Sequence, residues 1–205
     1  MTLRQLLSTA VQHRRCSLCL SRATRVIHQD GDAHYCRCED CRLIFQHGNL
    51  PTPSDELSRY NQHENCPQDK RYRKFLSPLI EAITARVPRN SVGLDFGCGP
   101  GPTLSVMLQE AGRECEVYDP FFRPDQEVIR GRNRYDYIVS SETFEHFHKP
   151  RVEIELLHGL LKPEGWLGVM TSQPGEDAKF ASWHYHRDPT HVCFWAQESF
   201  EYCAM

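Results

Sequence analysis

Hydrophobic and polar positions follow two different periods in the second half of the chain. Short apolar runs occupy residues 92–96, 115–119, 135–141 and 166–171. Between these runs, residues 102–111 and 151–161 repeat apolar side chains every three or four positions, which is the period of a helix packed on one face. Strands that alternate with helices predict a mostly parallel sheet with helices on both faces, which is the doubly wound α/β fold class.

A further helix is predicted just before the first of these strands. Ser77 is expected to be its N-cap and Pro78 its first residue, where the missing N–H of proline costs nothing. Apolar positions at helical spacing continue to Val87, and Pro88 ends the helix.

The whole of residues 51–90 is expected to form a helical connector or a lid. The segment is polar but contains Tyr60, His63 and Tyr72, whose rings can fold over a bound ligand. A plain surface linker is the alternative interpretation.

Ten cysteines are many for a chain of this length, and five of them fall between Cys16 and Cys41. Two CxxC pairs, Cys16 with Cys19 and Cys38 with Cys41, present four thiolates to one tetrahedral metal ion, which is usually structural zinc. The residues between the pairs predict a hairpin around a "QDGD" turn. Residues 1–50 are therefore interpreted as a zinc-ribbon module. Weaker alternative ligands are Cys36, His34 and His13.

Charge and composition exclude some kinds of partner. The 205 residues carry a net charge of −3, which gives no strong overall attraction to nucleic acid or to an anionic membrane. No apolar run approaches the roughly 18 residues that span a bilayer, and the N-terminus is too polar for a secretory signal. We therefore expect a cytoplasmic protein without a membrane partner. The sequence indicates no oligomeric state.

The first predicted strand is followed by a glycine turn made of Gly97, Gly99 and Gly101. A turn of this kind between a strand and a helix N-terminus lets a ligand approach the backbone closely. Pro102 stands where a dinucleotide-binding fingerprint would carry its third glycine, which disfavours NAD. Asp119 ends the next strand, where a carboxylate can accept hydrogen bonds from the ribose hydroxyls of a nucleoside.

These segments resemble the class I S-adenosylmethionine-dependent methyltransferases. "VGLDFGCGPG" resembles motif I of that family, "YDYIVSSETFEHFHKP" its fourth-strand motif and "LLKPEGWLGVMT" its fifth-strand segment. With the cysteine pairs in front and "WHYHRDPTHVCFW" behind, the chain is similar to bacterial methyltransferases that carry an N-terminal zinc ribbon. The resemblance implies a methyltransferase domain over residues 91–205, with S-adenosylmethionine as its cofactor.

The resemblance also assigns roles to particular residues. The glycine turn would meet the methionine part of the cofactor, and Asp95 would order that turn. Asp119 would hold the ribose, Phe121 would cover the adenine, and Glu142 would lie near the sulfonium.

Two departures from the family pattern are visible in the sequence. Residues 121–134 are too short for a full helix and a third strand, so we expect the adenine side of the cofactor pocket to be unusual. The antiparallel strand pair that closes the family's sheet has no counterpart before the chain ends.

The segment "WHYHRDPTHVCFW" supplies the candidates for the acceptor side. A methyl acceptor loses a proton around the time of transfer, and histidine is the side chain best suited to take it near neutral pH. His191 is the first choice as a general base, oriented by Asp188, and His186 is the second. The alternative is that these residues only pack the loop against the domain.

Three functions remain open at this point. The leading interpretation is a methyltransferase that acts on a small molecule or a carrier-linked metabolite. The second is an RNA or protein methyltransferase that docks through the ribbon, although the net negative charge disfavours nucleic acid. The third is a non-catalytic binding protein on a degenerate cofactor fold.

Overall fold

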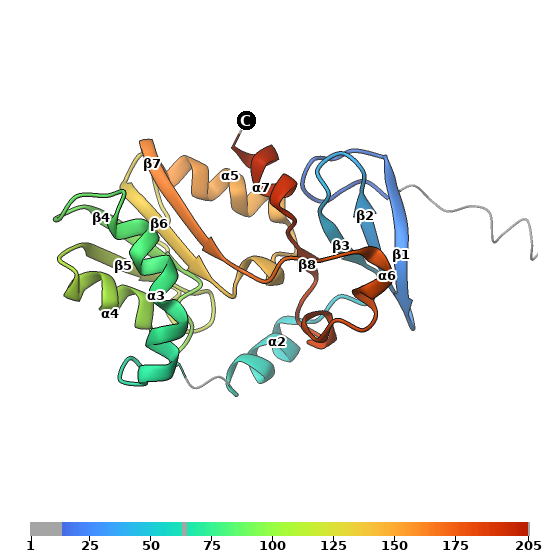
Figure 1. Cartoon of the computed structure of the whole chain (residues 1–205), viewed down its shortest axis with the longest axis horizontal. Coiled ribbons are helices and arrows are strands. Elements are labelled where there is room, and N and C mark those ends of the chain that lie inside the picture. The colour runs from blue at the N-terminus through green and yellow to red at the C-terminus, as the bar shows by residue number, and fades with distance from the viewer. Residues whose placement is uncertain (1–13, 63–64, 205) are drawn as a thin grey trace, which may run out of the picture.

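The computed structural model describes residues 14–62 and 65–204, and it contains two four-stranded sheets (Figure 1). The larger domain is built on sheet B, whose strands are ordered β5-β4-β6-β7 and are parallel throughout. Its strands are β4 (Val92–Phe96), β5 (Glu114–Tyr118), β6 (Tyr135–Ser141) and β7 (Leu161–Met170). The parallel sheet predicted from the alternation of strands and helices is confirmed.

Helices cover both faces of sheet B. Helices α3 (Lys70–Thr84) and α4 (Thr103–Glu110) lie on one face, and α5 (Pro150–Leu160) lies on the other (Figure 1). Successive residues of β6 show why, because Val139 belongs to the core under α3 and α4, whereas Ile138 belongs to the core under α5. This is the layering of a doubly wound domain.

The start of α3 differs from the prediction. The helix begins at Lys70, after Asp69, whose side chain caps it by accepting the N–H of Arg71. Pro78 therefore lies inside the helix, where it cannot bond the carbonyl of Lys74. The hydroxyl of Ser77 donates to that carbonyl instead, at 3.0 Å, so the helix continues through the proline.

Sheet A contains the predicted ribbon hairpin and one strand from far along the chain. Its order is β1 (Thr24–Asp30), β2 (Ala33–Cys38), β3 (Ile44–His47) and β8 (Cys193–Phe194). The strands are antiparallel, and β1 meets β2 at the turn after Asp30. The ribbon module was expected to end at residue 50 and the C-terminal domain to begin at residue 91. Strand β8 lies in the second of these ranges, yet it completes the sheet of the ribbon.

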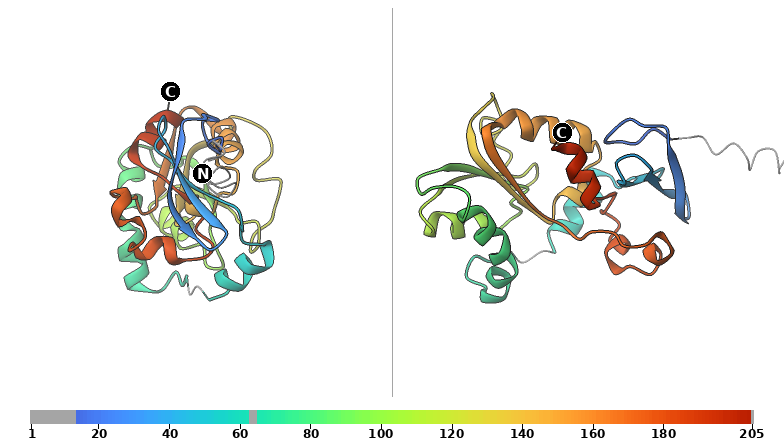
Figure 2. Two further views of the ribbon diagram at one scale, coloured as in Figure 1. Left: turned by 90° about the vertical axis from the view of Figure 1, so that its right-hand side faces the viewer. Right: turned by 45° about the horizontal axis from the view of Figure 1, so that its top comes forward.

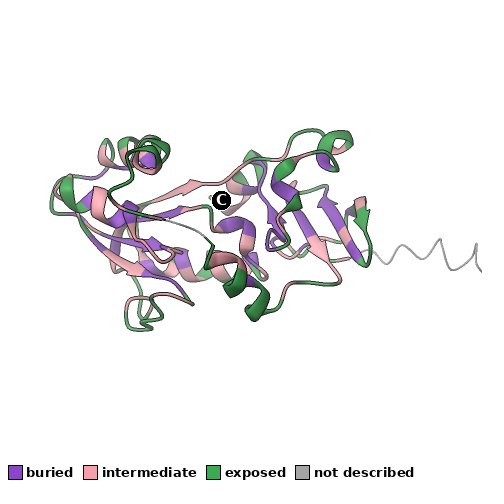
Figure 3. Ribbon diagram, turned by 90° about the horizontal axis from the view of Figure 1, so that it is seen from below, coloured by how far each residue is buried: buried purple, intermediate pink, exposed green. Residues whose placement is uncertain are grey.

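The two sheets share one core. Leu18, Leu43 and Phe45 of the ribbon are buried in the same hydrophobic cluster as Phe96 of β4 and Trp195. In Figure 3 the buried residues continue from one sheet to the other. The ribbon is thus packed against the α5 side of the larger domain.

Short helices fill the space around this junction. They are α2 (Pro53–Tyr60), the 3₁₀ helix η1 (Phe144–His146), α6 (Asp177–Phe180), the 3₁₀ helix η2 (His184–Arg187) and α7 (Gln197–Cys203). Figure 2 shows α7 between the two sheets. The Ser199 hydroxyl of α7 donates to the carbonyl of Cys41 at 2.8 Å, which ties this helix to the second cysteine pair.

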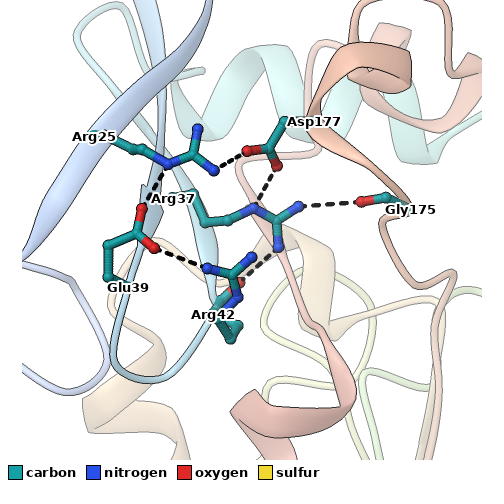
Figure 4. Close-up of polar contacts among 6 residues, drawn as sticks. All are labelled: Arg25, Arg37, Glu39, Arg42, Gly175 and Asp177. Carbon is teal, nitrogen blue, oxygen red and sulfur yellow. Dashed lines mark hydrogen bonds and ion pairs between the residues drawn. The ribbon is translucent and has the colours of Figure 1, made fainter.

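A buried arginine joins β2 to α6 (Figure 4). The Arg37 side chain is only 5% exposed, and its Nε contacts the Asp177 carboxylate at 2.5 Å. The same guanidinium donates to the carbonyl of Gly175 at 3.2 Å, and Arg25 also bonds Asp177. These contacts fix the start of the segment that leads to β8.

Residues 121–134 form neither a helix nor a named strand, as their length predicted. Arg123 in this segment makes one isolated β-bridge, with Asp119. Strand β5 is consequently an edge of sheet B. Among the described residues, no helix is both long and apolar enough to cross a bilayer.

Candidate active site

A cavity of about 710 Å³ lies at the carboxyl ends of β4, β5 and β6. This is where ligands bind in open α/β sheets. Six of the seven residues that the resemblance assigned to the cofactor line it: Asp95, Gly97, Gly99, Asp119, Phe121 and Glu142. His191 lines it as well.

The glycine turn is held in a conformation that other residues rarely adopt. Gly97 and Gly99 have φ angles of +80° and +63°, in the left-handed region. A Cβ on Gly97 would lie 2.3 Å from the Thr143 side chain, and one on Gly101 would lie 1.5 Å from the carbonyl oxygen of Asn65. Gly101 therefore lies under the connector and is not among the residues that line the cavity.

Asp119 links the glycine turn to the loop after β5. One carboxylate oxygen accepts the N–H of Gly99 at 3.0 Å, and the other accepts the N–H groups of Phe121 and Phe122 at 2.9 and 3.1 Å. A carboxylate has about four acceptor positions, so three backbone bonds leave it able to accept a ligand hydroxyl. The side chain predicted to hold a ribose also shapes both loops around that position.

Asp95 is buried at the end of β4, close to the N-terminus of α4. Its carboxylate accepts the backbone N–H of Ser105 in the first turn of that helix. Burial, opposed by this hydrogen bond and reinforced by repulsion from Asp119, raises the pKa of Asp95 to about 7. The position fits the predicted role of ordering the turn.

Aromatic side chains from the connector and the larger domain form one wall. Tyr60 and Tyr72 both line the cavity, and the ring of Tyr60 lies 5.5 Å from Phe121 and 5.0 Å from His146 between centroids. His63, the third aromatic residue expected there, lies outside the described residues.

Two glutamates that line the cavity, Glu142 and Glu145, form a polar group with Tyr185 just behind them. The hydroxyl of Tyr185 lies 2.5 Å from a carboxylate oxygen of Glu145 and 3.2 Å from one of Glu142. Thr171 donates to the second oxygen of Glu145 at 2.9 Å. Burial raises the pKa of each glutamate to about 7, and the charge of Glu145 adds to the effect on Glu142.

His191 lies beside this group. Its Nδ1 is 2.7 Å from the carbonyl oxygen of Tyr185, and a carbonyl only accepts, so Nδ1 carries the proton and Nε2 carries the lone pair. Burial and the neighbouring His146 lower the pKa of His191 to about 4. The ring is thus neutral at physiological pH.

Asp188 does not orient the His191 ring as predicted. Its carboxylate instead accepts hydrogen bonds from the backbone and hydroxyl of Thr190, at 3.1 and 2.7 Å, and contacts Arg59 at 2.8 Å. Only its backbone carbonyl bonds His191, through the backbone N–H at 3.1 Å. The carbonyl of Tyr185 takes the orienting role.

The structure does not bring His186 to the cavity. The ring is buried against His28, Tyr35 and Phe180, and its Nδ1 contacts the carbonyl of Trp183 at 2.8 Å. Its aromatic neighbours belong to the junction between sheet A and α6, because η2 folds back onto the ribbon. This position matches the alternative interpretation, in which the histidine only packs its loop against the rest of the protein.

The two cysteine pairs converge as their spacing predicted. The sulfurs of Cys16 and Cys41 are 3.5 Å apart, those of Cys19 and Cys38 are 3.4 Å apart, and all four lie within 4.8 Å of one another. Tetrahedral zinc with bonds of about 2.3 Å holds its sulfurs about 3.8 Å apart, so the four thiols fit such an ion. Cys36 and His34 are not part of this group, and His13 lies outside the described residues.

Sequence reasoning missed Glu145 and Tyr185. Both lie in segments that the motifs mark, "ETFEHF" and "WHYHRDPTHVCFW", where histidines are the more obvious candidates for acid–base chemistry near neutral pH. Sequence does not show that residues 145 and 185, which are 40 positions apart, share a hydrogen bond.

Comparison with known proteins agrees with this geometry. A family model described as a methyltransferase domain matches residues 68–204, about two thirds of the chain. The chain therefore belongs to the methyltransferase-domain family. A search of curated proteins finds no match.

Solved structures of similar fold share little sequence with the chain. The YcgJ protein of Bacillus subtilis is 17% identical over 62% of this chain and 65% of that one, with a TM-score of 0.45. A TehB-like SAM-dependent methyltransferase of Corynebacterium glutamicum is 18% identical over 58% and 73%, with a TM-score of 0.39. For three other matched structures, the chain spans between 44% and 66% of their length.

Proposed function

We propose that the protein transfers a methyl group from S-adenosylmethionine to a small molecule or a carrier-linked metabolite. The observation that carries the proposal is the single cavity shared by the glycine turn, Asp119 and the polar group around Glu142. It joins a place for a nucleoside to a place where an acceptor can lose a proton.

The residues around the glycine turn suit this cofactor. Asp119 can accept from the ribose hydroxyls, Phe121 offers a ring to the adenine, and the backbone at Gly97 and Gly99 is open to the methionine part. When bound, S-adenosylmethionine supplies an electrophilic methyl group on a positively charged sulfur. The carboxylates of the buried Asp95 and of Glu142 at the cavity wall favour a cation in the same cavity.

The charge of the lining favours a neutral or cationic small acceptor over nucleic acid. Among the described residues that line the cavity there is no lysine or arginine, and His148, whose pKa is raised, is already paired with the Glu56 carboxylate, so the lining offers a phosphate little positive charge. The lining carboxylates are Glu56, Asp95, Asp119, Glu142, Glu145, Glu153 and Asp188.

His191 is proposed to contact the acceptor. Its Nδ1–H is bonded to the carbonyl of Tyr185, so Nε2 is the ring atom with a free lone pair. That lone pair can take a hydrogen bond from a hydroxyl or amine of the methyl acceptor. His186 has no such position, since it packs in the ribbon junction.

We also propose that Cys16, Cys19, Cys38 and Cys41 hold one structural zinc ion. The four sulfurs leave no open ligand position for chemistry, so the ion would stabilise the ribbon and the parts of the chain packed against it.

Calorimetric titration of the full chain with S-adenosylmethionine and S-adenosylhomocysteine tests the cofactor directly. A methyl-transfer screen against pools of small metabolites, with tRNA and a protein extract as comparison acceptors, then tests the acceptor class. We expect binding of both nucleosides and methylation in the small-molecule pools. Absence of binding favours the non-catalytic alternative, and methylation of only RNA or protein contradicts the proposed acceptor.

A further inference from the structure

The hydroxyl of Tyr185 lies between the carboxylates of Glu142 and Glu145, and this arrangement constrains the number of protons present. A tyrosine hydroxyl has one proton to donate. It is within hydrogen-bond distance of both Glu145, at 2.5 Å, and Glu142, at 3.2 Å. If both carboxylates were ionised, one of the two contacts would join two acceptors with no proton between them.

The remaining donor in this group is already used. The Thr171 hydroxyl donates to the second oxygen of Glu145 at 2.9 Å, while it lies 3.3 Å from the Tyr185 oxygen. One more proton on either glutamate makes both contacts of Tyr185 with the glutamates hydrogen bonds. The burial of Glu145 and the partial desolvation of the Glu142 carboxyl favour the same outcome, since two neighbouring negative charges are costly away from water.

Glu142 is the member of the pair that a ligand can reach. Glu145 is fully buried and both its oxygens accept hydroxyls, whereas Glu142 is exposed and lines the cavity next to Thr143, the residue packed on Gly97. Glu142 also has a φ of +49°, which is uncommon for a residue other than glycine. Its backbone N–H is fixed to the carbonyl of Met170 at 2.8 Å. Backbone strain of this kind is typical of positions whose side chain must point at a site.

We propose that Glu142 and Glu145 share one proton in the ligand-free protein, that binding of the cationic cofactor expels it, and that Glu142 then accepts the proton of the methyl acceptor. The inference rests on the proposed function, because it needs a sulfonium in the cavity. It assigns the general-base role to Glu142 and leaves His191 to position the acceptor.

The chemistry balances with the groups named. The acceptor heteroatom forms its new bond to the methyl carbon, the carbon–sulfur bond breaks, and sulfur keeps that electron pair. The proton of the heteroatom passes to the Glu142 carboxylate and then to solvent, so the net product is one methylated acceptor, one thioether and one proton.

Other titratable groups face Glu142 from each element packed around it. Together they raise the pKa of Glu142, because the charge of Glu145 opposes ionisation of the Glu142 carboxyl and the neutral His191 adds no positive charge. These groups are Glu145 of η1, Tyr185 of η2, His191 before β8, Tyr72 of α3 and Asp95 of β4. A cation placed among them lowers the pKa of Glu142 and drives its proton out.

Proton release on binding measures this without any knowledge of the acceptor. Calorimetric titrations of the full chain at pH 7, in two buffers of different ionisation enthalpy, count the protons released per ligand bound. We expect S-adenosylmethionine to release between about 0.5 and about 1 proton, since one group with a pKa near 7 is about half protonated at that pH and a pair that shares a proton holds up to one. S-adenosylhomocysteine has the same amino and carboxyl groups but no sulfonium, so it should release far less.

Variants assign the proton to its source. Glu142→Gln should abolish the difference between the two ligands, and Glu142→Asp, which keeps a carboxylate, should retain it. Glu198→Gln removes an exposed carboxyl outside the cavity and should release as much as the unmodified protein. Binding of S-adenosylhomocysteine and a thermal melt report whether each variant is folded.

The outcomes separate the two proposals. If S-adenosylmethionine binds with no excess proton release, or if a folded Glu142→Gln variant releases as much as the unmodified chain, the inference about Glu142 is wrong while the proposed function stands. If neither nucleoside binds, the proposed function fails and the inference fails with it.

Discussion

Phe45 of β3 pairs with Cys193 of β8, so the cysteine-rich ribbon and the segment that carries His191 belong to one sheet. The connection continues through the backbone: Gln46 donates its N–H to the carbonyl of Val192 at 2.7 Å, and Val192 donates its own N–H to the carbonyl of Glu145 at 2.8 Å. The polar end of the cavity is therefore built partly on the ribbon.

Loss of the proposed metal site should consequently disturb the whole fold. Cys38→Ala removes one of the four thiols and leaves a gap in a core that also contains Phe96 and Trp195. We expect a lower melting temperature for a single unfolding transition, followed by circular dichroism, and less than one zinc ion per chain by metal analysis.

The control for this variant is Cys66→Ala, because Cys66 is exposed and its thiol bonds the nearby Gln68 side chain, far from the four-cysteine group in sequence. It should keep the metal content and melting temperature of the unmodified chain. Two separate transitions in Cys38→Ala, with the second unchanged, would show that the ribbon folds independently of sheet B.

The pH dependence of methyl transfer should distinguish Glu142 from His191. Loss of a positioned base or acceptor contact slows transfer by about 10²–10⁴. His191→Gln should slow it but keep the rise of kcat/KM for S-adenosylmethionine with pH near 7, because kcat/KM reports the ligand-free protein, in which the pKa of His191 is about 4 and that of Glu142 is about 7. Glu142→Gln should remove this rise. A rise that disappears in His191→Gln and persists in Glu142→Gln would restore the histidine as the base.

Much of the fold was predictable because periodic patterns carry it. The parallel sheet was predictable from the apolar runs at β4 and β6 and from the helical spacing of α5. The approach of the four cysteines was predictable from the spacing within the two pairs. Strand β8 was not predictable, since its two residues pair with β3 about 150 positions away and have no period of their own. The start of α3 was misplaced because the Ser77 hydroxyl compensates for Pro78, a tertiary detail with no sequence signal.

The site was predictable where a backbone motif defines it and not where side chains meet across the fold. The glycine turn and Asp119 follow from strand ends, which meet at one edge of any parallel sheet. The roles of His186 and Asp188 depend on how the loop after β7 folds back, and that is decided by contacts such as Asp188 with Arg59.

Asp95 should make the stability of the ligand-free protein depend on pH. Its pKa is about 7 in the folded chain and 3.8 in a model peptide, so the folded state binds more protons between these values. Its contribution is fully present below about pH 4 and is lost as the pH rises through about 7. Asp95→Asn keeps an acceptor for the Ser105 N–H but cannot titrate.

Urea unfolding at pH 5 and pH 8 checks this. From pH 5 to pH 8 the free energy of unfolding of the unmodified chain should fall relative to that of Asp95→Asn, by an amount on the order of 1–3 kcal/mol. The exposed Asp125→Asn should show no such difference. Parallel pH dependence of Asp95→Asn and the unmodified chain would mean that Asp95 is already ionised at pH 5.

The affinity of Asp119→Ala for S-adenosylhomocysteine tests the central claim, a nucleoside cofactor bound beside the glycine turn. The substitution removes a charged acceptor of hydroxyl hydrogen bonds and also releases the N–H of Gly99. A charged hydrogen bond contributes about 1.5–3 kcal/mol, so the dissociation constant measured by calorimetry should rise about ten- to a hundredfold, with Asp125→Ala unchanged. An unmodified chain that does not bind, or an Asp119→Ala variant that binds as tightly as the unmodified chain, would contradict it.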